Sequence, residues 1–167
     1  VLAESDAACV TAVSLILSSD GGHTPFAIAG MTSETGKCHT FDKHTDGYAR
    51  SEMCGAAALH MSECAMQEVA GLEGSAVRCD GKSASLTAPN GQAQRQVISA
   101  ALANAQISPS ALHIMEAHGT GTALGDPMEV GSISAVVLKH RNAHRNPMVI
   151  GSMKANAGHS EPGAGFS

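Results

Sequence analysis

The chain has 167 residues and a formal net charge of −5; 43% of its residues are hydrophobic, but only 2% are aromatic. This length suits one ordinary domain, although a core rich in small residues buries little surface per side chain. The charge argues against nucleic-acid binding, which needs clustered lysine and arginine. The longest nearly apolar stretch, residues 10–17, is too short to span a bilayer, and we recognise no signal peptide.

The first half of the chain predicts one helix and two strands. A short helix is predicted over residues 6–17, where Asp6 suits an N-cap and apolar residues recur on one face. Loose alternation of apolar and polar residues predicts strands over 55–61 and 68–79. Residues 80–91 are predicted to form a loop.

The second half predicts helices and strands in alternation. Residues 92–106 keep the apolar spacing of a helix, and short strands are predicted over 112–117 and 147–153. Between these strands a second helix is predicted, with Asp126 as its N-cap and Glu129 completing a capping box. This alternation predicts an α/β layered fold.

The five cysteines are odd in number and include no C-x-x-C pair, which disfavours a disulfide framework or a zinc site. His60 and Cys64 are four residues apart, but no second pair of ligands with suitable spacing accompanies them. We therefore predict no metal site. A reducing compartment follows by default, with the cytoplasm as the expected location and an organelle left open.

Residues 116–132 read "EAHGTGTALGDPMEVGS" and place a histidine before a loop rich in glycine and threonine. Gly119, Gly121 and Gly125 give G-x-G-x-x-x-G, which is one residue longer than a dinucleotide fingerprint, and no P-loop pattern is present. A phosphate cradle is therefore disfavoured. Taken alone, His118 fits an ordinary turn histidine.

Two further stretches favour a catalytic interpretation. "KANAGH" at 154–159 again places a histidine after a predicted strand and a glycine. "SDAACV" at 5–10 places Cys9 near the predicted start of a helix, where free N–H groups favour a thiolate. A cysteine with His118 and His159 would combine a nucleophile with two proton or oxyanion partners.

With these stretches the sequence resembles the β-ketoacyl synthase (ketosynthase) family of the thiolase fold. "DAACV" resembles the family's nucleophile motif D-T-A-C-S, and "EAHGTGTALGDPMEVGSI" matches E-A-H-G-T-G-T-x-L-G-D-P-I-E almost letter for letter. The G-T-G-T and D-P-x-E patterns are closer to those of type I polyketide and animal-type fatty acid synthases than to those of free-standing bacterial enzymes. Three more stretches resemble family motifs in order: "GKCHTFDKHTDGYARSEMCGAAAL", "GSAVRCDGKSASLTAPNG" and "GSMKANAGHSEPGAG".

The resemblance implies a thiolase-like layered α-β-α-β-α fold of which only the middle part is present. Residues 1–65 would end the N-terminal half of the ketosynthase and carry the nucleophile. Residues 66–167 would begin the C-terminal half and carry both histidine loops. Because the chain starts at Val1 and ends in "GAGFS", we expect an internal fragment of a longer protein.

The family's chemistry is a decarboxylative Claisen condensation in polyketide or fatty acid biosynthesis. The resemblance implies that Cys9 accepts an acyl group. His118 and His159 would promote decarboxylation of a malonyl group and stabilise the enolate-like oxygen. Lys154 would position His159 and tune the electrostatic field around it.

The resemblance also implies how substrate reaches this site. Thr120 and Thr122 would hydrogen-bond the amides of a phosphopantetheine arm carried by an acyl carrier protein. An acyltransferase domain would be a further partner, and the full domain would be a homodimer. No bound cofactor, metal, nucleic acid or membrane is implied.

Some departures from the family pattern motivate another hypothesis, a non-catalytic or decayed ketosynthase-like segment. The segment between Cys9 and the "GKCHTFD" motif is short, the serines that usually follow the cysteine are absent, and Ser51 replaces a glycine. The presence of Cys9, His118, Lys154 and His159 favours an enzyme. A thiolase or chalcone-type synthase is disfavoured, because those families use a single histidine with a second cysteine or an asparagine.

Overall fold

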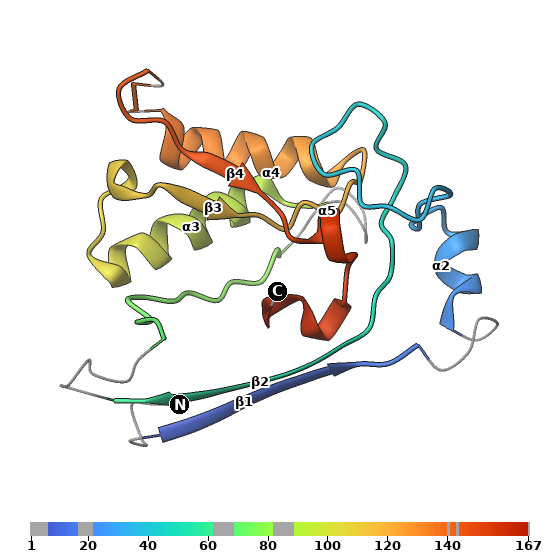
Figure 1. The fold of residues 1–167 in the computed structure, drawn as a ribbon. Helices are drawn as coiled ribbons and strands as arrows, with labels where there is room; N and C mark the ends of the chain where they lie inside the picture. The colour runs from blue at the N-terminus through green and yellow to red at the C-terminus, as the bar shows by residue number, and fades with distance from the viewer. Residues whose placement is uncertain are drawn as a thin grey trace.

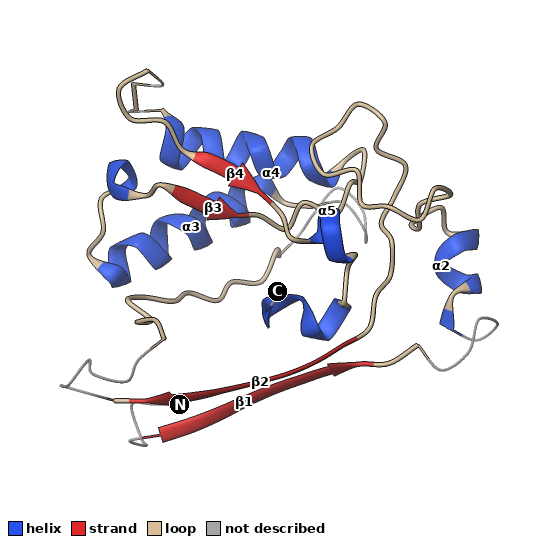
Figure 2. Ribbon diagram, viewed as in Figure 1, coloured by secondary structure: helices blue, strands red, loops and turns tan. Residues whose placement is uncertain are grey.

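Two separate two-stranded sheets organise the protein in the computed structural model (Figures 1 and 2). One sheet pairs β1 with β2 and the other pairs β3 with β4. Helices α3 and α4 flank the second sheet (Figure 2). The structure describes residues 7–16, 22–61, 69–81, 89–139, 141–142 and 144–166.

Strand β1 (Ala7–Ser14) pairs antiparallel with β2 (Met53–His60), in a register that runs from Ala7 opposite His60 to Ser14 opposite Met53. The helix predicted over 6–17 is therefore wrong. The stretch is rich in alanine and β-branched residues, and pairing with β2 decides its conformation over local helical spacing. The strand predicted over 55–61 is confirmed by β2, whose residues alternate between half-buried and exposed.

Strand β3 (Ile114–Glu116) lies parallel to β4 (Val149–Gly151), with Ile114 opposite Val149 and Glu116 opposite Gly151. Both strands were predicted, and both are shorter than their predicted ranges. Parallel strands need a crossover connection. Here it contains α4 (Gly125–Ile133), which continues directly into η2 (Ser134–Leu138), a π-helical turn.

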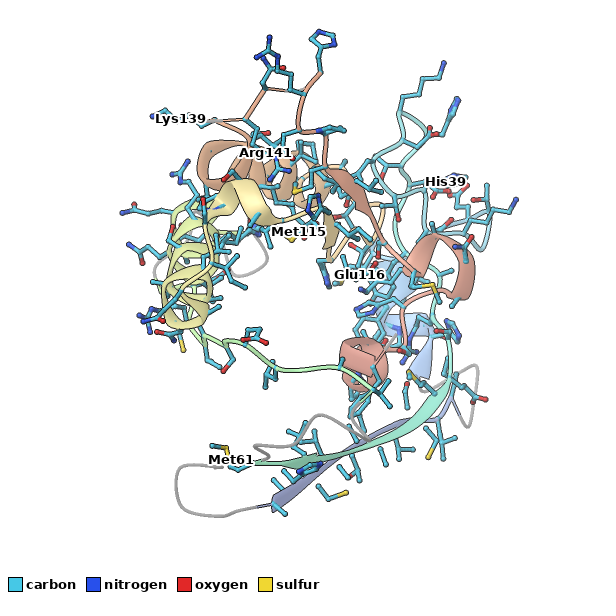
Figure 3. The ribbon with its side chains drawn as sticks, turned by 60° about the vertical axis from the view of Figure 1, so that its left-hand side comes forward. His39, Met61, Met115, Glu116, Lys139 and Arg141 are labelled. Carbon is cyan, nitrogen blue, oxygen red and sulfur yellow. The ribbon has the colours of Figure 1, made fainter. Side chains whose placement is uncertain are left out.

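The buried core lies between this crossover and the β3–β4 sheet. Ile133 and Val137 are almost fully buried and cluster with Ala117, the residue that follows β3. Arg141, which is labelled in Figure 3, follows this crossover and joins it to the segment before β3. It donates to the carbonyl oxygens of Pro109 and Leu112, at 2.6 Å each. The core therefore holds in place the sheet from which the glycine-rich loop emerges.

Helix α3 (Gly91–Ala105) confirms the helix predicted over 92–106 and packs against α4. The Asn90 side chain caps it by accepting from the backbone N–H groups of Gln92 and Ala93, at 3.0 and 3.2 Å. Gln106 ends it in the left-handed conformation, with φ of 55°.

Two local predictions are wrong. In the described range 69–81, which covers most of the strand predicted over 68–79, the chain forms no strand. The predicted capping box is also absent, because the N-cap of α4 is Leu124 and makes no side-chain capping bond. Asp126 and Glu129 are instead bound to the loop that precedes the helix.

The remaining elements are short. Helix α5 (Lys154–Ala157) follows β4, and η3 (Glu161–Phe166) lies against both β1 and β2. Helix α2 (Thr24–Ile28) and η1 (Pro109–Ala111) complete the described elements. None of the described helices combines the length and apolar character needed to cross a membrane.

Candidate active site

The loop after β3 is held by Asp126, whose carboxylate is buried, with 4% of the residue exposed. Oδ1 accepts from the backbone N–H groups of Gly121 and Thr122, both at 3.1 Å, and Oδ2 accepts from Phe41 N–H at 2.8 Å. One carboxylate thus joins the loop to a segment far away in the sequence. Hydrogen bonds to a charged acceptor are about twice as strong as neutral ones, which makes this contact a main support of the loop.

Glu129, one turn further along α4, holds the start of the same loop. Its Oε1 accepts from His118 N–H at 2.6 Å and its Oε2 accepts from Gly119 N–H at 2.9 Å. The two acidic residues of the D-P-x-E motif therefore fix the backbone that carries His118. The motif signalled two carboxylates at the right spacing, but the sequence did not show that the loop itself is their partner.

Two glycines in the loop have no room for a side chain. Gly119 has φ of 49°, and a Cβ there would lie 2.7 Å from Ser152 Cβ and 2.7 Å from Thr40 Cγ2. Gly121 has φ of 77°, and a Cβ there would lie 2.7 Å from the backbone nitrogen of His39. The glycines thus allow a close approach between backbone segments and a left-handed conformation.

His159 follows β4, α5 and Gly158. Its N–H donates to the carbonyl of Ala49 at 2.7 Å, and its carbonyl accepts from Ser51 N–H at 3.0 Å. The ring nitrogen Nδ1 accepts from the backbone N–H of Glu161 at 3.3 Å. A neutral imidazole that accepts at Nδ1 carries its proton on Nε2. His159 is therefore held as an Nε2–H donor.

The two histidine rings meet edge to face, with centroids 5.3 Å apart and an interplanar angle of 88°. This contact confirms that His118 and His159 share one site, as expected from the sequence. The rings meet because both loops leave the same ends of the parallel strands β3 and β4. Tyr48, which is buried, also contacts the His159 ring, with centroids 5.3 Å apart. Sequence analysis did not identify this tyrosine.

Burial and nearby positive charge lower the pKa of both imidazoles. The pKa of His159 is lowered to about 4, chiefly by desolvation and then by His118 and Lys154. The pKa of His118 is also lowered, by desolvation and then by the positive charge of Lys154. Lys154 itself is buried, with 4% of the residue exposed. Its charge lowers the pKa of both rings, which shows that it lies within electrostatic reach of the histidine pair.

A cleft of about 550 Å³ opens onto the histidine pair. Thr120 and Thr122 both line it. The other residues that line the histidine cleft are Ala29, Gly30, Met31, Tyr48, Pro89, Gln94, Ala123, Leu124, Gly125 and Glu129.

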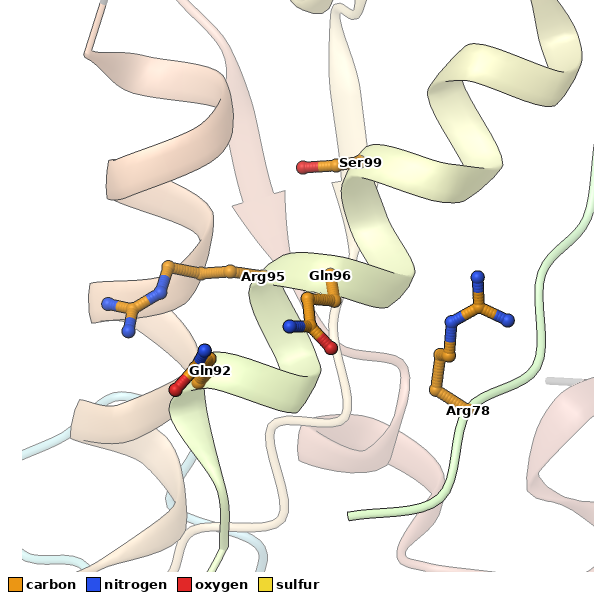
Figure 4. A pocket seen from close by; sticks show the side chains of 5 residues that line it. All are labelled: Arg78, Gln92, Arg95, Gln96 and Ser99. Carbon is orange, nitrogen blue, oxygen red and sulfur yellow. The ribbon is translucent and has the colours of Figure 1, made fainter. Parts of the chain in front are cut away.

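A separate hollow beside α3 contains neither histidine and is lined by Arg78, Gln92, Arg95, Gln96 and Ser99 (Figure 4).

The structure does not support Cys9 as the nucleophile of this site. Cys9 lies within β1, opposite Ala58, is exposed, and does not line the histidine cleft. The argument for a thiolate at a helix start is lost with the helix.

The other cysteines offer no replacement among the described residues. Cys38 is buried, with its pKa raised chiefly by desolvation, whereas Cys54 and Cys79 are exposed and line no part of the cleft. Cys64 lies outside the described residues. His60 belongs to β2, and within the described ranges no group of three potential metal ligands is found.

Comparison with protein families identifies the family to which this fold and its two histidine loops belong. The family model of the β-ketoacyl synthase N-terminal domain matches residues 1–65, and that of the C-terminal domain matches residues 69–167. The chain belongs to the β-ketoacyl synthase family. It holds part of a thiolase-like fold, as predicted.

Similar proteins are polyketide synthases. One phenolphthiocerol/phthiocerol polyketide synthase polypeptide of Mycobacterium tuberculosis is 39% identical over 175 residues, covering 99% of this chain and 9% of that protein. Erythronolide synthase EryA3 of Saccharopolyspora erythraea is 41% identical over 156 residues, covering 91% of this chain and 5% of that protein. The chain therefore spans less than a tenth of these relatives.

A solved structure gives the same assignment. The ketosynthase from module 6 of the bacillaene synthase of Bacillus subtilis 168 superimposes with a TM-score of 0.88 at 32% identity. The match covers 98% of this chain and 30% of that chain. The described architecture thus corresponds to a little under a third of a solved ketosynthase.

Proposed function

We propose that this chain is the part of a polyketide synthase ketosynthase that carries the histidine pair for decarboxylative Claisen condensation. The observation that carries the proposal is the contact between His118 and His159, two neutral imidazoles with ring centroids 5.3 Å apart at one cleft. A fatty acid synthase would use the same chemistry, but the polyketide synthase relatives favour the first assignment.

The proposed reaction starts with an acyl group on a cysteine thiol and a malonyl-type thioester in the cleft. The bond between C2 of the malonyl group and its carboxylate carbon breaks and releases CO2. The bonding electrons move to the thioester oxygen as an enolate, which His159 stabilises by donating from Nε2–H. Donors fixed at the position where charge develops are among the largest contributions to catalysis. The buried Lys154 adds positive potential at the same place.

In the second half of the reaction the enolate carbon attacks the acyl thioester carbonyl. A new carbon–carbon bond forms, the bond to the cysteine sulfur breaks, and the sulfur leaves as a thiolate. His118 supports this step by hydrogen bonding within the same cleft. Neutral histidines are suited to both halves, since a charged imidazolium at His159 would lose the acceptor site for Glu161 N–H.

The accepting cysteine is proposed to be a residue other than Cys9, because β1 holds Cys9 in a sheet and Cys9 does not line the cleft. Residues 1–65 and 66–167 are proposed to belong to the two halves of one ketosynthase, which the ranges of the two family matches support. The complete site, with the accepting cysteine, would then form only when these halves and the rest of the domain are together.

The proposed partners follow from this reaction. An acyl carrier protein would deliver the malonyl group on its phosphopantetheine arm, with Thr120 and Thr122 lining the path. An acyltransferase domain would load the carrier, and the domain would act as a homodimer. The described cysteines are all free thiols, which supports the cytoplasm or another reducing compartment.

The test is to measure CO2 release and condensation separately in the intact synthase. Malonyl-loaded carrier protein with a labelled carboxylate reports the first step, and mass spectrometry of the extended thioester reports the second. We expect His159→Ala to reduce CO2 release by roughly 10²–10³. Absence of both activities in the unmodified intact synthase would instead indicate a non-catalytic ketosynthase-like segment.

A further inference from the structure

Arg50 and Glu161 form an ion pair next to His159, in the turn of residues 159–161. The Arg50 guanidinium binds Glu161 through two bonds, Nε to Oε1 at 2.6 Å and Nη2 to Oε2 at 3.1 Å. The Arg50 side chain is 9% exposed and that of Glu161 is 28% exposed. Arg50 also lies over the Phe26 ring, 4.9 Å from its centroid, and donates from Nη1 to the carbonyl of Gly22. The guanidinium is therefore held by partners on several sides.

Glu161 has an unusual backbone conformation. Its φ is 49°, in the left-handed region that few residues other than glycine adopt. In this conformation its N–H reaches back to His159 Nδ1 at 3.3 Å. A glycine would reach the same conformation without strain, so the glutamate side chain must contribute something that glycine lacks. The contribution visible in the structure is the ion pair with Arg50.

Arg50 is also joined to His159 through the backbone. Residues 50 and 159 form a parallel β-bridge, in which Ala49 and Ser51 hydrogen-bond the His159 main chain on either side. The residues on either side of Arg50 therefore hold the main chain of His159, and the Arg50 side chain holds Glu161, two positions later. The Arg50 segment is thus linked both to the main chain of His159 and to the residue that donates to its ring.

We propose that Arg50 is a positioning residue for His159: its ion pair with Glu161 holds the 159–161 turn so that Glu161 N–H occupies Nδ1 and Nε2 keeps the proton. The catalytic meaning of this arrangement rests on the proposed condensation function, whereas the tautomer itself does not. A lysine would keep the charge but could not reproduce the two parallel bonds of the guanidinium fork. Arg50 would act without touching the substrate.

The experiment compares Arg50→Lys and Arg50→Gln with Arg95→Gln in the full-length ketosynthase domain. Arg95 is an exposed cation on α3 that lines the separate hollow, so its variant controls for loss of charge (Figure 4). Histidine labelled with ¹⁵N reports the tautomer of His159, assigned by the signal lost in His159→Gln. We expect a single Nε2–H form in the unmodified domain and in Arg95→Gln. Both Arg50 variants should show a mixture with the Nδ1–H form.

Kinetics separate this proposal from the proposed function. We expect Arg50→Lys to lower the kcat for condensation by about tenfold, equivalent to about 1.4 kcal/mol, with KM nearly unchanged. An unchanged tautomer in a folded Arg50→Lys domain would overturn the positioning role, whatever the kinetics. A mixed tautomer with unchanged kcat would keep the positioning role and contradict the proposed catalytic use of His159. If Arg50→Gln fails to fold, the lysine variant alone decides.

Discussion

Thr40 and Gly119 lie in contact although they come from different halves of the chain: the Thr40 hydroxyl donates to the Gly119 carbonyl at 2.5 Å. The contact lies beside His118 and is one of several between the Cys38–Ser51 segment and the histidine loops. Gly47 N–H donates to the Gly121 carbonyl at 3.0 Å, and Ala49 binds His159. The candidate site is therefore built across the two halves of the chain.

The pH dependence of His159 follows from its environment. Its pKa lies at about 4 in the folded protein, below its ordinary value of 6.5, so the fold resists protonation. Between these two values the unfolded chain binds a proton that the folded chain does not, and stability must fall as the pH falls from about 6.5 toward 4. Titration of the His159 ring protons by NMR should give a midpoint near pH 4. A midpoint near 6.5 would show that the ring is hydrated and the argument wrong.

Gly121 and Gly131 form a matched pair for testing the loop. A Cβ on Gly121 would meet the His39 backbone and requires a left-handed φ, so Gly121→Ala should destabilise the domain by about 1–3 kcal/mol. Gly131 lies in α4, where a Cβ would meet nothing within 4 Å, so Gly131→Ala should stabilise it by up to about 1 kcal/mol. Chemical denaturation of the full-length ketosynthase domain measures both. Equal effects of the two substitutions would contradict the close packing at Gly121.

We expect the Cys9 thiol to react with thiol reagents but not to be required for condensation. It is exposed in β1, so a thiol reagent should modify it readily, yet Cys9→Ser in the intact synthase should condense at the unmodified rate. A cysteine-directed acyl analogue, mapped by mass spectrometry, should label a different cysteine under turnover conditions. Acylation mainly at Cys9, together with an inactive serine variant, would establish Cys9 as the nucleophile, as its sequence motif predicts.

These 167 residues made alone should form neither a stable nor an active enzyme. The small β3–β4 sheet has exposed apolar side chains, with Ile114 72% and Val149 66% exposed, and β1 exposes Val10 and Val13. Such open apolar edges invite aggregation, and two-stranded sheets are marginal by themselves. We expect binding of a hydrophobic dye, a broad thermal transition and no condensation. A soluble monomer with a sharp transition and measurable condensation would contradict this.

Sequence patterns succeeded where the local signal and the tertiary environment agree. Strand β2 and helix α3 keep their expected periodicity, and α3 carries its own cap in Asn90. The family motifs also indicated that His118 and His159 belong to one site. The structure agrees, because the parallel strands β3 and β4 bring their loops together.

The failures have a common physical cause, which is a partner distant in the sequence. The stretch around Cys9 has helical spacing, but β2 supplies hydrogen bonds along its whole length. Asp126 and Glu129 stand at capping positions, but the preceding loop offers them several free N–H groups. The contribution of Arg50 likewise depends on Glu161, which follows it by more than one hundred residues. A single sequence does not reveal such pairings.

The contacts between the Cys38–Ser51 segment and the histidine loops also limit how ketosynthases can be recombined. A chimera joined within residues 62–88 would take the Cys38–Ser51 segment from one parent and both histidine loops from the other. Phe41 N–H would then meet the residue that the other parent has in place of Asp126. Arg50 would meet the residue that the other parent has in place of Glu161. Exchange of substrate specificity by such crossovers therefore requires parents that match at these two contacts, even where their overall identity is high.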